Sequence, residues 1–413
     1  MTLKSAFLAL IATLLLARSG ASNPWRRETN AYPVDIVDEL QDEGLERLAS
    51  YLAKNPPQSN CTLETAAKRM EWHREEYTAA VLCLQSLPSR APEGAAPGAI
   101  SRYDDFVAIH ILFIDTLHTP AHILPAHRLY TYLYEQALRE ECGYTGYQPY
   151  WNWGRYADDP ASSPLFDGTM ASLGGNGEPV DYPGATFPYP PPWDHMPPGG
   201  GGGCVTDGPF KDMTVTLGPV APVPLNISAN PQPNGLGYNP RCLRRDLNKF
   251  ASAVTTHQHT FDLIVESETA DAFHDRMMGM TLQDWGVHVG GHYTINGDPG
   301  GDPYVSPGDP AFYFHHGMID RVWWIWQLQD PENRMTLVPG QDPKAAAPLD
   351  WAGTLFDHYV SEYPFNPGEA GFEYEEYLDT DAVDFGWLAG PWTLRELADT
   401  VGTTGGEFCY IYV

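Results

Sequence analysis

The chain has 413 residues and a formal net charge of -29 at pH 7, with 39 Gly and 38 Pro. Binding to nucleic acid or to an anionic membrane needs clustered Lys and Arg, so this charge argues against both partners. The length fits one large domain or two, and the many Gly and Pro residues indicate long ordered loops around a compact scaffold.

The N-terminus has the pattern of a secretory signal peptide. Lys4 precedes an apolar run from Ala6 to Ala17, and small residues follow at 19–21. The run is too short for a membrane-spanning helix of roughly 20 residues. We therefore expect residues 1–21 to be removed and the protein to be secreted. We expect residues 22–59 to form an N-terminal segment that is either trimmed or loosely packed, and residues 60–413 to form the main domain.

Apolar residues recur at helical spacing in six later stretches. We predict helices over residues 64–87, 100–117, 126–141, 243–264, 281–292 and 310–329. Pro120 and Pro125 interrupt the chain between the second and third helices. From residue 158 to 239 the periodicity disappears and Pro and Gly dominate, which predicts a long loop. Aromatic residues interleave with these prolines, so we favour a loop packed on one domain over a linker between two.

The cysteines agree with export. Their number is even, which predicts three disulfide bonds, and the fifteen possible pairings stay open. Their spacings fit no zinc-binding pattern. They are Cys61, Cys83, Cys142, Cys204, Cys242 and Cys409. Asn60 and Asn226 begin Asn-x-Ser/Thr tripeptides and are predicted glycosylation sites.

Eight of the 14 histidines fall into two short apolar segments. The first holds His110, His118, His122 and His127, and the second holds His288, His292, His315 and His316. A lone His is more often a surface or satisfied core residue, and we interpret His73, His195, His257, His259, His274 and His358 as surface or capping residues. Two clusters of four need another explanation, which is metal binding.

His288 and His292 lie four residues apart in a predicted helix, so their imidazoles share one helical face and can share one ion. No Glu follows His288, so the zinc protease pattern His-Glu-x-x-His is absent. The third ligand of this cluster is expected in the helix that Asp309 and Pro310 open.

In that helix, His316 is the predicted ligand and His315 its neighbour. Asp320 lies one turn later, where it could orient a ligand histidine through the second ring nitrogen. The alternative is a buried helix whose adjacent histidines only satisfy backbone groups.

In the first cluster, His110 lies within a helix, His118 where helix becomes loop, and His127 in the first turn after Pro125. His122 is interpreted as a near-site or surface residue. Ligation by imidazole alone suits copper, and three neutral nitrogens per ion leave positions open for dioxygen. We therefore expect two copper ions per chain, each held by three histidines.

With these residues in place, the chain resembles the tyrosinase, catechol oxidase and hemocyanin superfamily of coupled binuclear copper proteins, from about residue 69 to 413. His110, His118 and His127 match the first copper site. His288, His292 and His316 match the second, the last within the signature Asp-Pro-x-Phe-x-x-x-His-x-x-x-Asp at 309–320.

Further matches lie outside the ligands. They include residues 69–72, the Pro-Tyr-Trp-Asn-Trp motif at 149–153, in which Asn152 is a candidate residue near the site, and the Tyr-x-Tyr motif at 410–412. The resemblance implies a cation-π contact of Arg69 with this motif, Tyr410 and Tyr412. It also implies that the C-terminal lid domain of many relatives is absent, as in short secreted fungal polyphenol oxidases.

Departures from the family pattern bear on the substrate. Thr116 stands where the thioether Cys would be, so no Cys–His crosslink is expected. Val289 follows His288 in place of Asn, and no Glu lies near Gly279 to orient a water that deprotonates a phenol. A catechol, whose first proton is easier to remove, is then the better substrate. Ala126 replaces an aromatic residue, which predicts a wider entrance.

We therefore predict a mainly α fold: a central four-helix bundle that holds a dicopper site, with long Pro/Gly-rich loops and a few short strands. The predicted reaction oxidises o-diphenols to o-quinones and reduces dioxygen to water. One alternative is a true tyrosinase that also hydroxylates monophenols or o-aminophenols, with solvent or Asp284 as the base. Another is a dioxygen carrier like hemocyanin. The gate residue over the first copper is expected at Tyr304, Val305 or Ser306.

Overall fold

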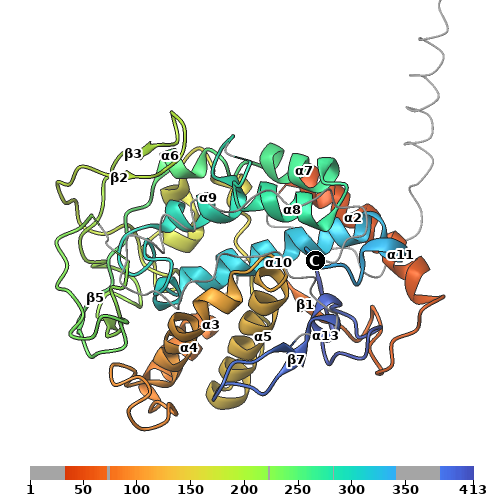
Figure 1. The fold of residues 1–413 in the computed structure, drawn as a ribbon, viewed down its shortest axis with the longest axis horizontal. Coiled ribbons are helices and arrows are strands. Elements are labelled where there is room, and N and C mark those ends of the chain that lie inside the picture. The colour runs from red at the N-terminus through yellow and green to blue at the C-terminus, as the bar shows by residue number, and fades with distance from the viewer. Residues whose placement is uncertain (1–32, 72–74, 222–223, 282, 341–381) are drawn as a thin grey trace, which may run out of the picture.

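Helix α10 (Ala311–Gln329) is the central element of the fold. In the computed structural model, which describes residues 33–71, 75–221, 224–281, 283–340 and 382–413, every residue of α10 from Ala311 to Leu328 is buried. Apolar and aromatic residues lie on every face of α10, which is typical of a helix inside the protein. In Figure 1, α10 crosses the middle of the molecule, with α3, α4 and α5 on one side and α7, α8 and α9 on the other.

The other described helices surround α10. They are α2 (Ile36–Leu52), α3 (Glu75–Ser86), α4 (Arg102–Leu117), α5 (Ile123–Cys142), α6 (Lys249–Ser252), α7 (His257–Glu266), α8 (Ala270–Met277), α9 (Gly286–Ile295), α11 (Pro331–Arg334) and α13 (Leu394–Ala398), with short 3-10 turns η1 (Trp153–Arg155), η2 (Pro160–Ser162), η3 (Pro164–Phe166) and η4 (Ser306–Gly308). Capping boxes at Asp35, Ser101 and Thr393 begin α2, α4 and α13. The mainly α fold class is confirmed.

The described strands are short and pair two by two. They are β1 (Ala67–Arg69) with β8 (Tyr410–Tyr412), β2 (Ala185–Thr186) with β3 (His195–Met196), β4 (Thr214–Val215) with β5 (Arg241–Cys242), and β6 (Ala382–Val383) with β7 (Trp392–Thr393). The β1–β8 pair is parallel, with Arg69 opposite Tyr412. It joins the start of the main domain to the C-terminal end of the chain.

Several predicted helix boundaries are wrong. The helix over 64–87 is a strand, β1, followed by the shorter α3, because the first half pairs with the distant β8. Helix α5 begins at Ile123, so Pro125 lies in its first turn, where the missing N–H costs no hydrogen bond. The helix over 243–264 is divided into α6 and α7, and α9 begins at Gly286 and not at 281.

The prediction of a loosely packed N-terminal segment is wrong for residues 36–52. These residues form α2, which packs against α10. Arg321 of α10 donates to the Asp38 carboxylate at 2.8 Å and to the Gln41 side chain at 2.8 Å, and all three side chains are buried. The predicted signal peptide lies outside the described residues.

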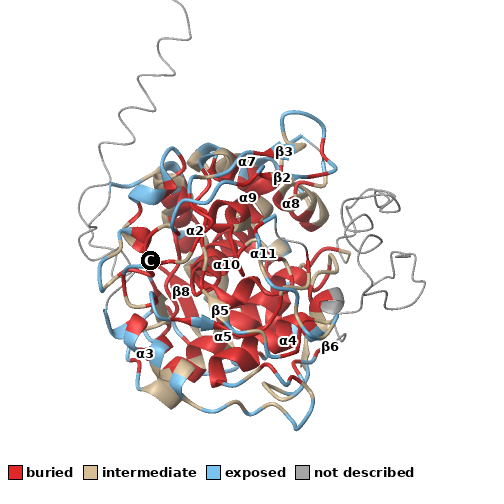
Figure 2. Ribbon diagram, turned by 90° about the vertical axis from the view of Figure 1, so that its left-hand side faces the viewer, coloured by how far each residue is buried: buried red, intermediate tan, exposed pale blue. Residues whose placement is uncertain are grey.

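Three disulfide bonds form, as predicted: Cys61–Cys409, Cys83–Cys142 and Cys204–Cys242. The last closes the second part of the long Pro/Gly-rich loop, from Cys204 to Cys242. The loop lies at the left of Figure 1 around β2, β3 and β5. Figure 2 shows the buried residues concentrated in α10 and the helices that flank it. Within the described ranges, no helix has both the length and the apolar character that a membrane crossing requires.

Candidate metal centre

The first triad, His110, His118 and His127, comes from α4 and α5. His110 lies inside α4, His118 is its C-cap, and His127 lies in the second turn of α5. The ring centroids lie 4.9 to 5.6 Å apart. The chain folds back between α4 and α5, as the prolines at 120 and 125 predict, and so brings the three rings together.

Each ring of the first triad is oriented through Nδ1. The Nδ1 of His118 lies 2.9 Å from the Ile114 carbonyl, and that of His127 lies 2.8 Å from the Ile123 carbonyl, in both cases four residues back in the chain. The Nδ1 of His110 lies 2.9 Å from the carbonyl of Tyr304, on a distant loop. A carbonyl can only accept, so each Nδ1 carries the proton and each Nε2 is left with a free lone pair.

The second triad, His288, His292 and His316, comes from α9 and α10. The Nε2 of His292 lies 3.3 Å from that of His288 and 3.1 Å from that of His316. Three nitrogens bound to one ion at about 2.0–2.1 Å in tetrahedral geometry would lie about 3.3 Å apart. The second triad therefore already has the spacing of a three-nitrogen metal site.

The two triads face each other. The His127 and His316 rings are stacked, with centroids 4.3 Å apart and an interplanar angle of 16°. Phe312, one turn before His316, contacts rings of both triads, with centroids 5.5 Å from His110 and 4.2 Å from His316. The predicted convergence of six imidazoles as two facing sets of three is therefore observed in the structure.

The donors fit metal ions. The Nε2 atoms of His110 and His127 are buried and have no hydrogen-bond partner among the described residues, which is costly unless an ion binds there. Burial, and then the neighbouring His118, lower the pKa of His110 to about 3, and burial lowers that of His118 to about 4. Burial likewise places the pKa values of His127 and of the second triad well below the usual range. All six rings are thus neutral at pH 7, the form that binds a metal.

His315 extends the second cluster to four imidazoles. One ligand atom from each of His288, His292, His315 and His316 lies within 4.8 Å of the others. The His315 ring packs against Trp153 at 5.2 Å and fills the space beside Gly291, where a Cβ would collide with its Cε1. Because Gly291 has no side chain, α9 and α10 can approach each other with the His315 ring between them.

Asp320 does not orient a histidine, so that prediction is wrong. Its carboxylate accepts from Arg128 Nε at 2.6 Å, Arg69 Nη1 at 3.3 Å and the Tyr410 hydroxyl at 2.7 Å, and also from Tyr412. The guanidinium carbon of Arg69 lies 3.6 Å from the Tyr410 ring centroid, which confirms the predicted cation-π contact. Asp320 therefore anchors β8 to α10.

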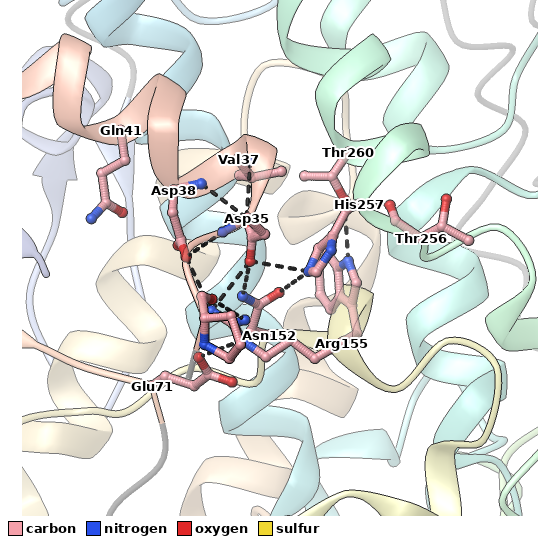
Figure 3. A network of polar contacts seen from close by, with 12 residues as sticks. Asp35, Val37, Asp38, Gln41, Glu71, Asn152, Arg155, Thr256, His257 and Thr260 are labelled. Atoms are coloured by element: carbon pink, nitrogen blue, oxygen red, sulfur yellow. Dashed lines mark hydrogen bonds and ion pairs between the residues drawn. The ribbon is translucent and has the colours of Figure 1, made fainter. Parts of the chain in front are cut away.

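Asn152 also lies away from the triads. Its amide donates to Asp35 at 3.0 Å, and its oxygen lies 3.3 Å from His257 Nε2 (Figure 3). Arg155 completes this network with ion pairs to Asp35 and Glu71. The network fixes the start of α2 against α7 and η1, and its link to the site runs through the packing of Trp153 on His315.

The predicted gate residues are buried. Tyr304 is 5% exposed and supplies the carbonyl that orients His110, Val305 is 0% exposed, and Ser306 is 2% exposed. The Val289 side chain, after His288, is partly exposed and packs against an aromatic cluster that includes Trp285 and Tyr293. Which residue gates the first triad stays a prediction.

Asp284, the predicted base, lies two residues before the first residue of α9. It accepts from the Gly286 N–H at 2.7 Å, and its other oxygen lies 3.9 Å from His259 Nε2. Ala126 is fully buried, so it adds nothing to an exposed entrance. The side chain of Thr116 lies outside the described residues.

The other histidines lie outside the triads. His122 contacts the Thr119 hydroxyl at 2.7 Å, and His195 is exposed. The surface or capping interpretation is wrong for His274, which is 2% exposed and beside Asp275. His73 and His358 lie outside the described residues.

Sequence reasoning missed the clamp on α10. Arg245 makes two bonds to Asp309, at 2.8 and 3.0 Å, while Asp309 accepts from the Ala311 N–H at 2.9 Å. All of these groups are buried. The clamp fixes the start of the helix that carries His316, and nothing in the local spacing of Arg245 indicates it.

Comparisons with known proteins agree with this geometry. Residues 100–329 match the common central domain of tyrosinase. The tyrosinase-like protein orsC of Emericella nidulans is 43% identical over 69% of this chain and 80% of its own length. The N-acetyl-6-hydroxytryptophan oxidase ivoB of the same organism is 37% identical over 85% of this chain and 93% of its own length.

A solved structure shares the fold. A mutant form of the polyphenol oxidase of Thermothelomyces thermophila has a TM-score of 0.76 and 38% identity, and the match covers 91% of this chain and 97% of that one. The domain match, the relatives and the six converging histidines lead to one conclusion. The chain belongs to the tyrosinase family and is a copper-dependent oxidoreductase.

Proposed function

We propose that the chain is a secreted polyphenol oxidase that binds two copper ions and oxidises o-diphenols to o-quinones. The observation that carries the proposal is the pair of triads facing each other at the 4.3 Å contact of His127 and His316. When bound, two copper ions supply the electron-transfer chemistry that lets one dioxygen accept four electrons. Two catechols each lose two electrons and two protons, and dioxygen becomes two waters.

The chain's own residues hold the ions and exclude water. His110 and His127 hold the first ion with His118, and the second triad holds the second. His118 and His292 are the partly exposed ligands, whereas the other four are buried. A flat phenolic ring therefore reaches the ions from the side where His118 and His292 lie. Val289 belongs to α9, the helix that carries His292.

Val289 supports the preference for catechols. Its side chain has no hydrogen-bonding atom, so it cannot hold a water near His288 to take a phenol proton. The Asp284 carboxylate is engaged by the Gly286 N–H at the start of α9. The substrate in the name of the N-acetyl-6-hydroxytryptophan oxidase has one ring hydroxyl, so this relative supports a hydroxylated aromatic substrate and not the preference for catechols.

Oxygen uptake by the copper-loaded enzyme tests the proposal. We expect two coppers per chain and prompt uptake with catechol, but a lag or no uptake with tyrosine or a simple monophenol. A Val289→Asn variant should raise the rate on the monophenol relative to that on catechol. Prompt uptake with a monophenol and no catechol priming would show a true tyrosinase, and copper binding without any catechol turnover would show a dioxygen carrier.

Secretion is part of the proposal. The three disulfides suit an oxidising compartment, and both predicted glycosylation residues, Asn60 and Asn226, are exposed. N-terminal sequencing of the protein from culture medium should find a start after residue 21. Endoglycosidase treatment should then lower the mass, and Asn60→Gln and Asn226→Gln variants would assign the loss to each residue.

A further inference from the structure

Asp302 is a buried carboxylate that neither the copper ligands nor the tyrosinase signature includes. Its side chain is 0% exposed. One oxygen accepts from the Tyr304 N–H at 3.0 Å, and the other accepts from the Val220 N–H at 2.7 Å and the Ala221 N–H at 3.0 Å. The carboxylate therefore ties the loop before η4 to the loop around residue 220.

Two hydrogen bonds separate Asp302 from the first triad. The Asp302 carboxylate accepts from the Tyr304 N–H, and the Tyr304 carbonyl accepts from the Nδ1 of His110 at 2.9 Å. The other two rings of this triad bond to carbonyls four residues back in the chain. His110 is thus the member of the first triad whose orientation depends on a distant loop.

The second oxygen of Asp302 supports the same loop from its other side. Val220 and Ala221 follow Gly218, where a Cβ would lie 2.6 Å from the Val305 side chain. The two loops are therefore in close contact next to Tyr304, and the Asp302 carboxylate lies where they meet.

The charge environment sets Asp302 apart from its neighbour Asp298. Arg241 pairs with Asp298 at 2.6 and 2.8 Å, whereas the ion pairs of the described residues include none to Asp302. Burial, with a smaller contribution from Asp298, raises the pKa of Asp302 to about 7 against the lowering effect of its backbone bonds. A buried carboxyl without a cation costs stability, and its three backbone hydrogen bonds offset part of that cost.

We infer that Asp302 is a positioning residue for the first copper ion, acting through the Tyr304 backbone on His110. This inference rests on the proposed copper site. Groups that orient a ligand histidine through its second nitrogen change metal affinity by about 10–100-fold when they are removed. We therefore expect loss of Asp302 to speed copper release from the first triad and to leave the second triad unchanged.

Copper release into excess chelator tests the inference in two backgrounds. His288→Ala/His292→Ala should leave one copper, in the first triad, because only His315 and His316 remain of the second cluster, and His118→Ala should leave one, in the second. In the His288→Ala/His292→Ala background, Asp302→Ala should speed release by about 10-fold, the lower end of that range, because Asp302 lies one hydrogen bond further from the ring. In the His118→Ala background, the same substitution should leave the release rate unchanged.

Two further variants separate positioning from general loosening. Asp302→Ser keeps a hydroxyl that can accept the N–H two residues on, so it should restore part of the copper retention that Asp302→Ala loses. Asp298→Asn removes a buried carboxylate of the same loop and should lower stability without a selective effect on the first triad. Should Asp302→Ala fail to fold, Asp302→Leu carries the same comparison, since its side chain fills the space without an oxygen that can accept the Tyr304 N–H.

Equal release rates with and without Asp302 in the His288→Ala/His292→Ala background would overturn the inference. Equal acceleration from both triads would also overturn it, because that outcome indicates loosening of the whole domain. A wild-type protein that binds no copper would instead refute the proposed function, so the two failures are distinguishable.

Discussion

Replacing Asp320 with Asn should destabilise the protein more than any surface change. The carboxylate lies between two fully buried guanidiniums, those of Arg69 and Arg128, and also accepts from Tyr410 and Tyr412. Arg69 keeps Glu135 at 3.1 Å, but Arg128 loses its ion-pair partner. Removing one member of a buried pair costs about 3–5 kcal/mol, a large part of the total stability of a typical domain.

Denaturant unfolding of Asp320→Asn measures this loss as a lower midpoint at unchanged slope. Glu332→Gln is the control, because Glu332 pairs with Lys54 at 2.7 Å while half-exposed, and a change within about 0.5 kcal/mol is expected. A loss below about 1 kcal/mol for Asp320→Asn would refute the reasoning, since buried pairs are expected to cost several times more. It would mean that the two arginines find other partners.

The pH dependence gives a second check on Asp320. Burial raises its pKa, but the charges of Arg128 and Arg69 outweigh this effect and hold the pKa below the ordinary value. A carboxyl with a lowered pKa in the folded state stabilises above the unfolded-state pKa, and that contribution is lost as the pH falls. The stability difference between wild type and Asp320→Asn should therefore shrink in acid.

Four further outcomes follow from the site. Gly291→Ala places a Cβ against the His315 ring, which should lower the free energy of unfolding by about 1–3 kcal/mol and weaken copper binding in the second triad. Gly390→Ala is the control and should have neither effect, because no atom lies within 4 Å of its Cβ position. Removing copper with a chelator should lower the unfolding temperature, since each ion stabilises by about 4 kcal/mol at a free concentration about 1,000 times Kd. Below about pH 6.5 the metal-free protein should lose further stability. Its histidines bind protons in the unfolded state but stay neutral in the folded state, where burial lowers their pKa. The raised pKa of Asp302 means that its contribution to stability is lost as pH rises from about 4 to about 7, so Asp302→Asn should flatten the unfolding free energy over that range.

The ligands could be predicted from the sequence because their spacing is local. The four-residue step from His288 to His292 places both rings on one helical face. Pro120 interrupts the helical pattern between His118 and His127, and the three rings of the first triad can converge only if the chain folds back there. The signature that begins at Asp309 identifies His316 as the third ligand of the second triad. Helix periodicity and turn chemistry act over a few residues, which is the range that a single sequence reports.

The supports of the site could not be predicted, because they join distant segments. The sequence predicts that Asp320 orients a histidine one turn away, but Asp320 binds Arg69, 251 residues before it, and Tyr410, 90 residues after it. The stretch from 64 has helical periodicity, yet its start pairs with β8. Neither the Asp302 contact with Val220 nor the Arg245 clamp on Asp309 leaves a periodic signal.

The two triads are held by different means, and this difference follows from their helices. In the first triad all three Nδ1 atoms have a carbonyl partner, so the rings are oriented by hydrogen bonds. In the second, the Nδ1 atoms of His288 and His316 are buried with no partner among the described residues, and the rings are oriented by packing against Phe312 and His315. A hydrogen bond holds a ring nitrogen within a narrow range of distance and angle, and the His288 and His316 rings lack this restraint at Nδ1. Copper itself must therefore contribute more to ordering the second triad, while the first depends on the protein and, through Tyr304, on Asp302.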